Sequence, residues 1–340
     1  MCARTRSSTP PGPGSTAPTS SPSPSAPSAS ANSSPATSRT APPNRSARCG
    51  RRPPVFDFAD PGTLDLRYRG QGRCPTATGA ELYYESVGSG PPIVCLNNFF
   101  IVAPAWRNFT SRLARDHTIV TYDLRNQGVS SPGPGTHHFD DHVGDLRDLL
   151  DHLGLDDVHL IGTSASTLIC RDFAIRHPDR VRGLVLTGPA FSPYGPLRMR
   201  LMARDWLRRL DQQQAAGVFD YLYPLVFTDK AIERGGRATY LALREHFLAL
   251  NSEAQVRACV TELLQASGDP GLLKRIGRPV LLLIGDGDHL WSASTLKDAV
   301  DLMPDATGHI VEGAGHMPFI EAVEEFEAAV ARFTERTAAP

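Results

Sequence analysis

The stretch Val158-His159-Leu160-Ile161-Gly162-Thr163-Ser164-Ala165-Ser166 decides how the rest of this sequence is interpreted. Residues 158–161 form a mostly apolar run of strand length, and residues 168–177 have the pattern of a helix that Pro178 ends. Almost no loop separates the two, so the strand and helix backbones nearly touch and need small residues around Ser164. Gly162 and Ser166 meet that need. The stretch predicts a sharp turn that exposes the Ser164 hydroxyl and points the first N–H groups of the helix at whatever it attacks.

The pentapeptide at 162–166 is weak evidence when it is taken alone. Its usual form is Gly-x-Ser-x-Gly, and here Ser166 replaces the last glycine. A serine at a strand–helix turn is often only an N-cap. The rest of the chain decides between a capping serine and a catalytic one.

Residues 1–54 differ in composition from the remainder. After Met1 they contain no Val, Leu, Ile, Phe, Tyr or Trp, are dominated by Ser, Pro, Ala and Thr, and carry seven Arg with no acidic residue. Such a segment cannot bury enough apolar surface to offset its ordering entropy, so we predict that it is disordered. A transit peptide and a secretory signal are disfavoured, because prolines interrupt any amphipathic helix and an apolar stretch is missing. We interpret residues 1–54 instead as a linker or as the result of a start codon assigned too far upstream.

Charge and cysteine content are those of an ordinary enzyme. The formal net charge is −1, and without the seven N-terminal arginines about −8 is left for the remainder. This balance suggests neither nucleic acid nor a membrane surface as a partner, and no run approaches the roughly 18 apolar residues of a membrane span. The six cysteines show no paired spacing. Cys95 falls in an apolar strand and Cys170 in the helix after Ser164, so we interpret them as small core residues in a reducing compartment and expect a cytoplasmic protein.

Strand and helix patterns alternate through the first half of the remaining chain. Residues 77–88 look like the second arm of an antiparallel hairpin that turns near Gly79. Helices are predicted at 106–115 and 139–153, the second from apolar residues at steps of four and three. Continuous apolar strands are predicted at residues 93–96, 118–122, 158–161 and 181–186. The alternation predicts a parallel sheet with right-handed crossovers.

Residues 192–272 break this rhythm. Their apolar residues recur at helical spacing, as in Met199, Met202, Trp206 and Leu210. An all-helical insertion between sheet strands is most simply a cap over the carboxyl edge of the sheet, where open α/β sheets bind ligands. The sheet resumes at 280–284 and 309–311, and a last amphipathic helix carries Phe319, Val323, Phe326, Val330 and Phe333. We therefore predict a core made of residues 55–191 and 273–340 and a helical cap at 192–272.

Two loops after the last two strands complete the candidate site. One is Gly285-Asp286-Gly287-Asp288, and the other is Glu312-Gly313-Ala314-Gly315-His316. In a parallel sheet both loops leave the edge that carries Ser164. A serine hydroxyl is a poor nucleophile until an imidazole takes its proton, and a buried carboxylate fixes the tautomer of that imidazole. Serine, acid and histidine thus meet in this chain order above one edge.

Taken together, these motifs make residues 76–334 resemble the α/β-hydrolase superfamily, in the branch with a helical cap. The matching stretches are 162–166, 123–130, 285–288 and 315–318, with Glu321 beyond. The resemblance implies an α/β fold with a mostly parallel eight-stranded sheet, flanking helices and an all-helical cap insertion. It also implies Ser164 as nucleophile, His316 as base and Asp288 as acid, with the family's spacing favouring Asp288 over Asp286.

Each of these roles has a plainer alternative. A histidine in a glycine loop is often only a turn residue, although an elbow upstream makes catalysis the better interpretation of His316. Asp288 could instead cap the helix expected near Ser292, or Asp286 could hold the acid role. His289 is interpreted as a solvated loop residue.

The oxyanion hole is where this sequence departs from the family. The family commonly has His-Gly after its third strand, and this chain has Asn97-Asn98. By the resemblance, the donors are the backbone N–H groups of Ala165 and Phe99, and Asn98 could add its own amide. A residue in place of the glycine loses backbone freedom, although Asn tolerates positive φ better than most residues.

Aromatic residues near these loops predict the character of the pocket. We expect Asn98, Phe100 and Trp291 to lie at the substrate, where an apolar lining favours a hydrophobic acyl chain over a sugar or a peptide.

The cap segment 197–210 also carries Arg198, Arg200, Arg204, Arg208 and Arg209 against the single acid Asp205. Such a face is usually only solvated, but it could dock an acidic partner such as an acyl carrier protein.

The favoured function is a cofactor-free serine hydrolase of a small-molecule carboxylic ester or acyl thioester, with no metal. One alternative is a lyase or carbon–carbon bond hydrolase that uses the same three groups to move protons, which the Asn97-Asn98 loop motivates. Another is a non-catalytic small-molecule binder on the same fold. Haloalkane dehalogenase and epoxide hydrolase chemistry is disfavoured, because related folds use an aspartate where Ser164 stands.

Overall fold

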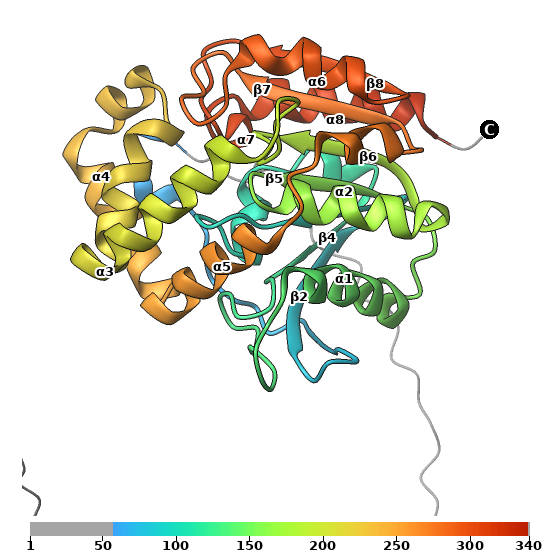
Figure 1. Cartoon of the computed structure of the whole chain (residues 1–340), viewed down its shortest axis with the longest axis horizontal. Helices are drawn as coiled ribbons and strands as arrows, with labels where there is room; N and C mark the ends of the chain where they lie inside the picture. Colours follow the sequence, from blue (N-terminus) through green and yellow to red (C-terminus); the bar gives the residue numbers. More distant parts are fainter. Residues whose placement is uncertain (1–56, 339–340) are drawn as a thin grey trace, which may run out of the picture. The chain divides into compact units, whose positions relative to one another are not determined.

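The computed structural model describes residues 57–338, so the disorder predicted for residues 1–54 lies outside the described residues. Its centre is an eight-stranded sheet with the strand order β1-β2-β4-β3-β5-β6-β7-β8 (Figure 1). The strands are β1 Gly72–Pro75, β2 Glu81–Gly88, β3 Pro92–Leu96, β4 Thr118–Tyr122, β5 Val158–Thr163, β6 Val181–Thr187, β7 Val280–Gly285 and β8 Ala306–Val311. Strand β2 is antiparallel to both β1 and β4, and every other pair is parallel. The prediction of a mostly parallel eight-stranded sheet is confirmed.

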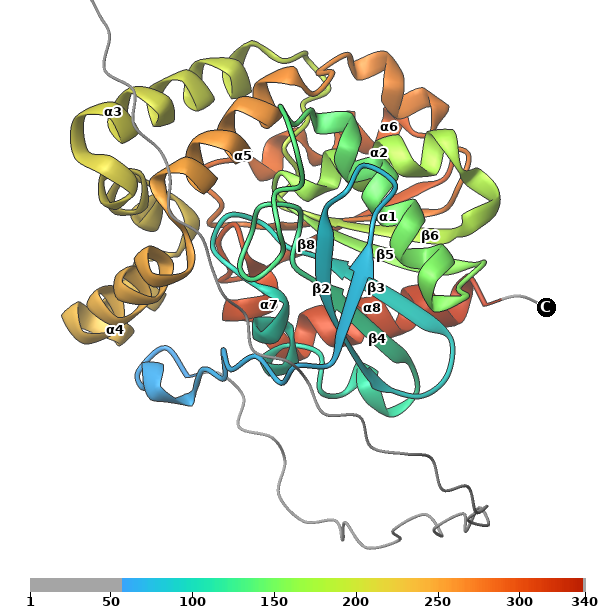
Figure 2. The ribbon, with the colours of Figure 1, turned by 90° about the horizontal axis from the view of Figure 1, so that it is seen from below.

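Helices cover both faces of this sheet, which explains the continuous apolar strands. Every residue of β5 and of β7 is buried. Figure 2 shows α1 (Phe139–Leu153), α2 (Ser166–Arg176) and α6 (Leu296–Leu302) on one side of the sheet and α8 (Val323–Arg336) on the other. Helix α1 has the predicted bounds, with its apolar face buried and Gly154 in the left-handed conformation that ends it.

The α-helix predicted at 106–115 is wrong. The structure has two 3-10 segments instead, η2 (Ala103–Asn108) and η3 (Leu113–Arg115). The Asn108 amide donates to the Ala105 carbonyl at 2.8 Å and the Thr110 hydroxyl to the Trp106 carbonyl at 2.9 Å. These side chains bind carbonyl groups that a longer helix would pair with backbone N–H groups.

The sequence pattern predicts one continuous helix at the end of the chain, but the structure has two. The helix is divided into α7 (Pro318–Glu321) and α8, because Ala322 between them is non-helical, with φ −133° and ψ 54°. The apolar positions of both pieces still face the core: Phe319, Val323, Phe326, Val330 and Phe333 are all buried.

Between β6 and β7 the described chain contains helices and no strand. These are α3 (Leu197–Val226), α4 (Asp229–Leu250) and α5 (Glu253–Gln265), which form one group beside the sheet in Figure 1. Gln214 within α3 and Gly236 within α4 have positive φ and kink their helices. Aromatic contacts join this group to the loop after β3: Phe99 packs on Trp206, and Phe100 on Phe219 and Phe247. The helical insertion is therefore present, and 192 and 272 as its domain boundaries stay a prediction.

Across residues 57–338, helices that are both long and apolar enough to cross a membrane are absent.

Candidate active site

The turn between β5 and α2 has the sharp geometry that the sequence predicts. Ser164 has φ 54°, a left-handed conformation that is rare for a residue with a side chain and that concentrates at functional sites. A Cβ atom on Gly162 would lie 2.8 Å from Cys170 Sγ and 3.1 Å from the Thr167 Cα. Strand and helix therefore approach too closely at this point for any larger residue.

Ser166 occupies the position of the usual glycine and takes on a structural role there. Its side chain is fully buried, and its Oγ accepts the Thr163 N–H at 2.9 Å. The hydroxyl lies within hydrogen-bond distance of two carbonyl oxygens, at 3.0 Å from Thr163 and 3.2 Å from Leu96. Ser166 thus fixes the end of β5 against both the turn and the neighbouring β3.

The two aspartates of the acid loop, residues 285–288, have different environments. Asp288 is buried, and its Oδ2 lies 2.8 Å from Nδ1 of His316. Its Oδ1 accepts the N–H groups of Leu290 and Trp291, each at 2.8 Å. Asp286 is exposed and accepts the Gly313 N–H at 2.8 Å. Asp288, and not Asp286, is therefore the carboxylate that contacts the imidazole, while it also caps its own turn.

The imidazole of His316 is buried and held from two sides. Its backbone N–H donates to the Val226 carbonyl at 2.8 Å, and its Nδ1 faces Asp288. A carboxylate partner places the proton on Nδ1 and leaves Nε2 as the basic nitrogen. Nε2 is buried and has no hydrogen-bond partner among the described residues. The expected hydrogen bond from the Ser164 hydroxyl is thus not formed in this structure.

Contacts of the backbone nevertheless place the serine turn beside the histidine. The Ser164 N–H donates to the Thr187 carbonyl at 3.0 Å, at the end of β6. The next residue, Gly188, touches the imidazole, because a Cβ atom there would lie 2.8 Å from Nδ1 of His316. Ser164 and His316 therefore both pack against one dipeptide at the carboxyl edge of the sheet. Apo enzymes often show long catalytic hydrogen bonds that shorten only with substrate bound.

Asn98 connects the three loops of the candidate site. Its amide Nδ2 lies 3.3 Å from Thr163 Oγ1 and 3.2 Å from Met317 Sδ, one residue before Ser164 and one residue after His316. Its Oδ1 accepts the Phe100 N–H at 2.8 Å. Asn98 is absent from the residues with positive φ, so this loop does not need the conformational freedom of glycine. The Asn98 amide, a possible extra oxyanion donor from the sequence, is thus engaged with Thr163 and Met317.

The two backbone donors of the expected oxyanion hole are free. Within residues 57–338, neither the Phe99 N–H nor the Ala165 N–H donates to a protein acceptor. The Asn98–Thr163 hydrogen bond joins the segments that carry them. A small cavity of about 30 Å³ lies beside both residues. Two unpaired N–H groups next to a cavity can bind a negatively charged oxygen.

A buried polar pair on the wall of this small cavity was missed by the sequence analysis. Nε2 of His142 on α1 lies 2.9 Å from Glu262 Oε2 on α5, and Nδ1 of His142 has no partner among the described residues. The pair connects the sheet-flanking helices to the insertion. A signal for it existed, because His142 falls beside Phe139 and Val143 on the apolar face of the predicted helix.

Asn97 and Asp123 fix the loops behind the site. The Asn97 amide donates to Gln127 at 3.1 Å and accepts the Trp106 indole N–H at 2.9 Å. Asp123 accepts the Ala103 N–H at 2.8 Å and the Val129 N–H at 3.0 Å. Burial raises the pKa of Asp123 to about 6 despite these hydrogen bonds.

The expected pocket residues Phe100 and Trp291 line different cavities. Phe100 lies with Phe219 and Met317 at an apolar cavity of about 40 Å³. Trp291 is buried at a second cavity of about 230 Å³, lined by the segment after β6, the start of α3 and the chain after Asp288. Its indole N–H donates to Thr295 at 3.2 Å. Asn98 lines the small cavity beside Phe99 and Ala165, so the three expected pocket residues do not share one cavity.

Glu321 joins the histidine loop to the insertion. One carboxylate oxygen accepts the N–H and the hydroxyl of Thr228, at 3.0 and 2.7 Å, and the other accepts the Gly315 N–H at 2.7 Å. Burial raises the pKa of Glu321 above its usual range. This carboxylate fixes the residue before His316 against the start of α4.

Residues 88–329 match the model of a family described as "Alpha/beta hydrolase family". The chain belongs to the alpha/beta hydrolase family. This assignment agrees with the strand order and with the turn at Ser164, and it confirms the resemblance drawn from the sequence.

Individual members of the family are similar to this alpha/beta hydrolase over most of its length. A 2-hydroxy-6-oxo-6-(2'-aminophenyl)hexa-2,4-dienoic acid hydrolase of Metapseudomonas resinovorans is 23% identical, over 78% of this chain and 91% of its own. A pimeloyl-[acyl-carrier protein] methyl ester esterase of Chromobacterium violaceum is 27% identical, over 76% and 100%. The solved structure of a thermophilic esterase from Thermogutta terrifontis superposes with a TM-score of 0.71 at 22% identity, over 79% of this chain and 99% of the esterase. The likeness to the solved structure shows the fold.

Proposed function

We propose that this alpha/beta hydrolase is a cofactor-free serine hydrolase that cleaves a carboxylic ester or acyl thioester with a hydrophobic acyl part. The contact between Asp288 and Nδ1 of His316, beside the left-handed Ser164, carries the proposal. The free N–H groups of Phe99 and Ala165 and the apolar residues around Phe100 support it.

In the proposed reaction, the Ser164 hydroxyl attacks the substrate carbonyl while Nε2 of His316 takes its proton. Asp288 stabilises the imidazolium that forms. The N–H groups of Phe99 and Ala165 bind the oxyanion of the tetrahedral intermediate. The intermediate collapses to an acyl-enzyme when His316 returns the proton to the departing alcohol or thiol. Water, deprotonated by the same imidazole, then releases the carboxylic acid and restores Ser164.

Carbon–carbon bond hydrolysis is the second candidate. The relative from Metapseudomonas resinovorans is named as the hydrolase of a 2-hydroxy-6-oxo dienoic acid, a compound that contains no ester bond. The missing Ser164–His316 hydrogen bond is compatible with a role of the three residues in moving protons without acylation of Ser164. A non-catalytic binder is less favoured, because the full set of serine, acid and histidine is present at one edge of the sheet.

We place the protein in the cytoplasm, which the free cysteines among residues 57–338 support.

Activity assays of matched variants separate these candidates. We expect wild type to hydrolyse p-nitrophenyl and thioester substrates of medium acyl length, and Ser164→Ala and His316→Ala to lose at least about 10³-fold in kcat. Retention of most activity on a carbon–carbon substrate by Ser164→Ala, with loss in His316→Ala, would favour the second candidate. Ligand binding without turnover over the whole panel would favour the binder.

An acyl carrier protein is the proposed partner that delivers the acyl group. Leu197, Arg200, Leu201, Arg204 and Arg208 recur at helical spacing on α3 and are all exposed. Arg200 and Arg204 form no ion pair with another described residue, whereas Arg208 shares Asp205 with Arg209. A basic helix face with exposed leucines complements an acidic helical partner. The methyl ester esterase relative, whose name includes an acyl-carrier protein, supports this partner.

Charge reversal on this face tests the partner separately from the chemistry. We expect Arg200→Glu together with Arg204→Glu to lower kcat/KM for an acyl-carrier-bound substrate at least about tenfold, with free p-nitrophenyl esters unaffected. Arg332→Glu on α8 is the matched control, since Arg332 is exposed, forms no ion pair with another described residue and lies outside the insertion. An equal loss on both substrate types, or no loss on either, would contradict carrier docking at this helix face.

A further inference from the structure

A large cavity lies on the sheet face between β2 and β4, away from the loops that carry Ser164 and His316. Its volume is about 910 Å³, within the range of small-molecule sites. Its floor comes from β2 and β4, and its walls from the chain around η1 (Pro61–Thr63) and from η2 and η3. The proposed hydrolysis uses none of its lining residues.

The floor of this cavity is apolar at one end and polar at the other, because of the way β2 and β4 pair. In the antiparallel register of β2 and β4, Val87 lies opposite Ile119 and Glu85 opposite Thr121. Residues two apart on a strand share a face, so both pairs point to the same side of the sheet. Val87 and Ile119 line the cavity together with Ala114, and Thr121 lines it next to them. One end of the floor is therefore hydrocarbon and the other end polar.

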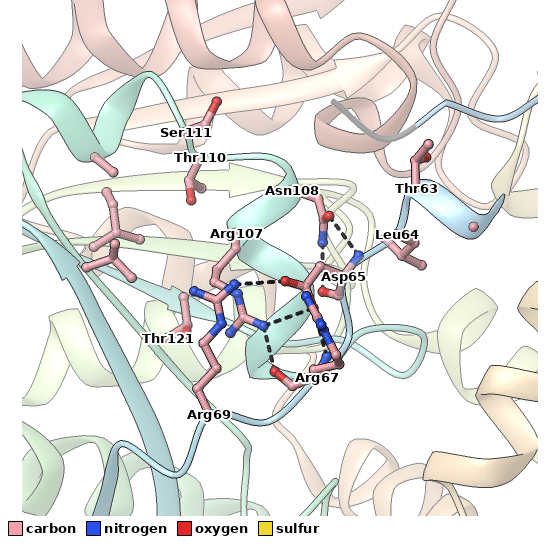
Figure 3. Close-up of a pocket in the computed structure, with 14 residues that line it drawn as sticks. Thr63, Leu64, Asp65, Arg67, Arg69, Arg107, Asn108, Thr110, Ser111 and Thr121 are labelled. Carbon is pink, nitrogen blue, oxygen red and sulfur yellow. Dashed lines mark hydrogen bonds and ion pairs between the residues drawn. The ribbon is translucent and has the colours of Figure 1, made fainter. Parts of the chain in front are cut away.

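Arginines gather over the polar end. Figure 3 shows Arg67, Arg69 and Arg107 grouped around Asp65, with Thr121 close by. Asp65 Oδ1 lies 3.1 Å from Arg67 Nε and 3.5 Å from an Arg107 Nη, and its Oδ2 lies 2.9 Å from an Arg69 Nη. Arg107 also pairs with the buried Glu85. Three guanidinium groups face two carboxylates, so one positive charge is left uncompensated.

Two polar groups of the lining lack partners. Nε of Arg107 and Oγ1 of Thr121 are shielded from water and form no hydrogen bond. Thr121 is 4% exposed, so water in bulk does not replace the missing partner. A polar group buried without a hydrogen bond is unfavourable, and native structures rarely keep one without a reason. Both Nη groups of Arg107 are engaged, so its Nε–H and the Thr121 hydroxyl are the unpaired donors here. Two such donors at the end of a hydrocarbon floor suit a carboxylate with an apolar tail.

We propose that this cavity is a second ligand site, which binds a small amphipathic monoanion of the fatty-carboxylate class. The carboxylate lies at Arg69, Arg107 and Thr121, and the tail lies along Val87 and Ile119. The site is separate from the proposed hydrolytic site and does not depend on the chemistry assigned to Ser164.

Titration calorimetry of the full chain with octanoate tests the proposal, with octanamide as the uncharged control of equal size. We expect saturable binding of octanoate and at least about tenfold weaker binding of octanamide. Arg69→Met should weaken octanoate binding at least about fivefold, because it removes one of the three positive charges at the polar end from an exposed position. Thr121→Val should weaken it while leaving the protein as stable as wild type, since it removes an unpaired hydroxyl at nearly constant volume. Arg176→Met, remote from the cavity, should change nothing.

Hydrogen exchange with and without octanoate locates the ligand. Added protection is expected at residues 83–88 and 118–122. No saturable binding by wild type would overturn the proposal, as would equal binding of octanamide. Protection confined to residues 160–166 would also overturn it, because octanoate would then occupy the site at Ser164 instead. If Arg69→Met and Thr121→Val both bind octanoate as wild type does, the cavity is not the site.

Discussion

Nδ1 of His316 lies 2.8 Å from Oδ2 of Asp288, and the other oxygen of that carboxylate accepts two N–H groups of its own loop. A carboxylate held by these three hydrogen bonds cannot rotate away from the imidazole without breaking its own turn. The ring of His316 is thereby fixed with Nε2 on the side away from Asp288. This relationship is the structural basis of the base that we propose for Ser164.

Asp288→Asn should lower kcat by about 10³- to 10⁴-fold, because the amide cannot hold the imidazole tautomer that leaves Nε2 basic. Asp286→Asn is the matched control, since Asp286 is exposed and contacts Gly313 instead of His316. We expect it to keep kcat within about threefold of wild type. Steady-state kinetics on p-nitrophenyl butyrate checks both, with circular dichroism for folding. Similar losses in the two variants would mean that the contact seen here does not select the acid.

Gly188→Ala should disable the site by pushing on His316. Gly188 has φ +50°, and a Cβ atom there would lie 2.5 Å from the His316 carbonyl oxygen and 2.8 Å from Nδ1. We expect kcat to fall at least about tenfold, with a lower melting temperature. Gly144→Ala in α1 is the control, because its Cβ would meet nothing within 4 Å. This change should leave kcat unaltered and stabilise the fold by about 0.5–1 kcal/mol. Full activity in Gly188→Ala would show that the imidazole does not depend on this contact.

Asn98→Ala should reduce kcat by about 10- to 100-fold with little change in KM, because the Phe99 N–H would no longer be held against the serine turn. Asn98 acts here as a positioning residue, through its bonds to Thr163, Met317 and the Phe100 N–H. Thr163→Val removes only the first of these bonds and should have a smaller effect. The split between kcat and KM is the measurement. A rise in KM at constant kcat would indicate that Asn98 binds substrate instead.

Part of the pH dependence of the fold's stability should come from His159. Burial lowers the pKa of His159 to about 4, whereas an unfolded chain has a histidine pKa of about 6.5. Between these values the unfolded state binds a proton that the folded state excludes. The contribution of His159 is thus complete above pH 6.5 and is lost as the pH falls toward 4, by up to about 3 kcal/mol. Urea unfolding at pH 7.0 and 4.5 should show a smaller loss in His159→Phe than in wild type.

His246→Gln is the control for that comparison, since His246 is exposed on α4. It should lose stability between the two pH values as wild type does. If His159→Phe loses just as much, the buried imidazole does not set this part of the pH dependence.

Elements with strong local signals were predictable from the sequence. Helix α1 has the predicted bounds, and strands β3 to β7 lie within two residues of their predictions, because continuous apolar runs and helical spacing depend on short stretches of chain. Strand β8, which is mostly not buried, begins three residues before its predicted start at 309. The turn at Ser164 was predictable for the same reason. Its small neighbours and the nearby strand and helix are all contained in about twenty residues.

Features that arise from side chains meeting across the fold were not predictable. The helix expected at 106–115 failed because Asn108 and Thr110 bind backbone carbonyls, which helical periodicity does not reveal. The bridging role of Asn98 depends on the end of β5 and on Met317, more than 200 residues away. The His142–Glu262 pair and the separation of Phe100 from Trp291 depend on how the insertion packs, for which the sequence carried no distance information.

Labelling by a fluorophosphonate probe tests directly whether His316 activates Ser164. We expect one phosphonyl adduct per chain, located by peptide mapping on Ser164, abolished in Ser164→Ala and slowed at least about 100-fold in His316→Ala. A folded wild type that stays unlabelled, or a His316→Ala variant that is labelled as fast as wild type, would contradict the proposal that His316 activates Ser164.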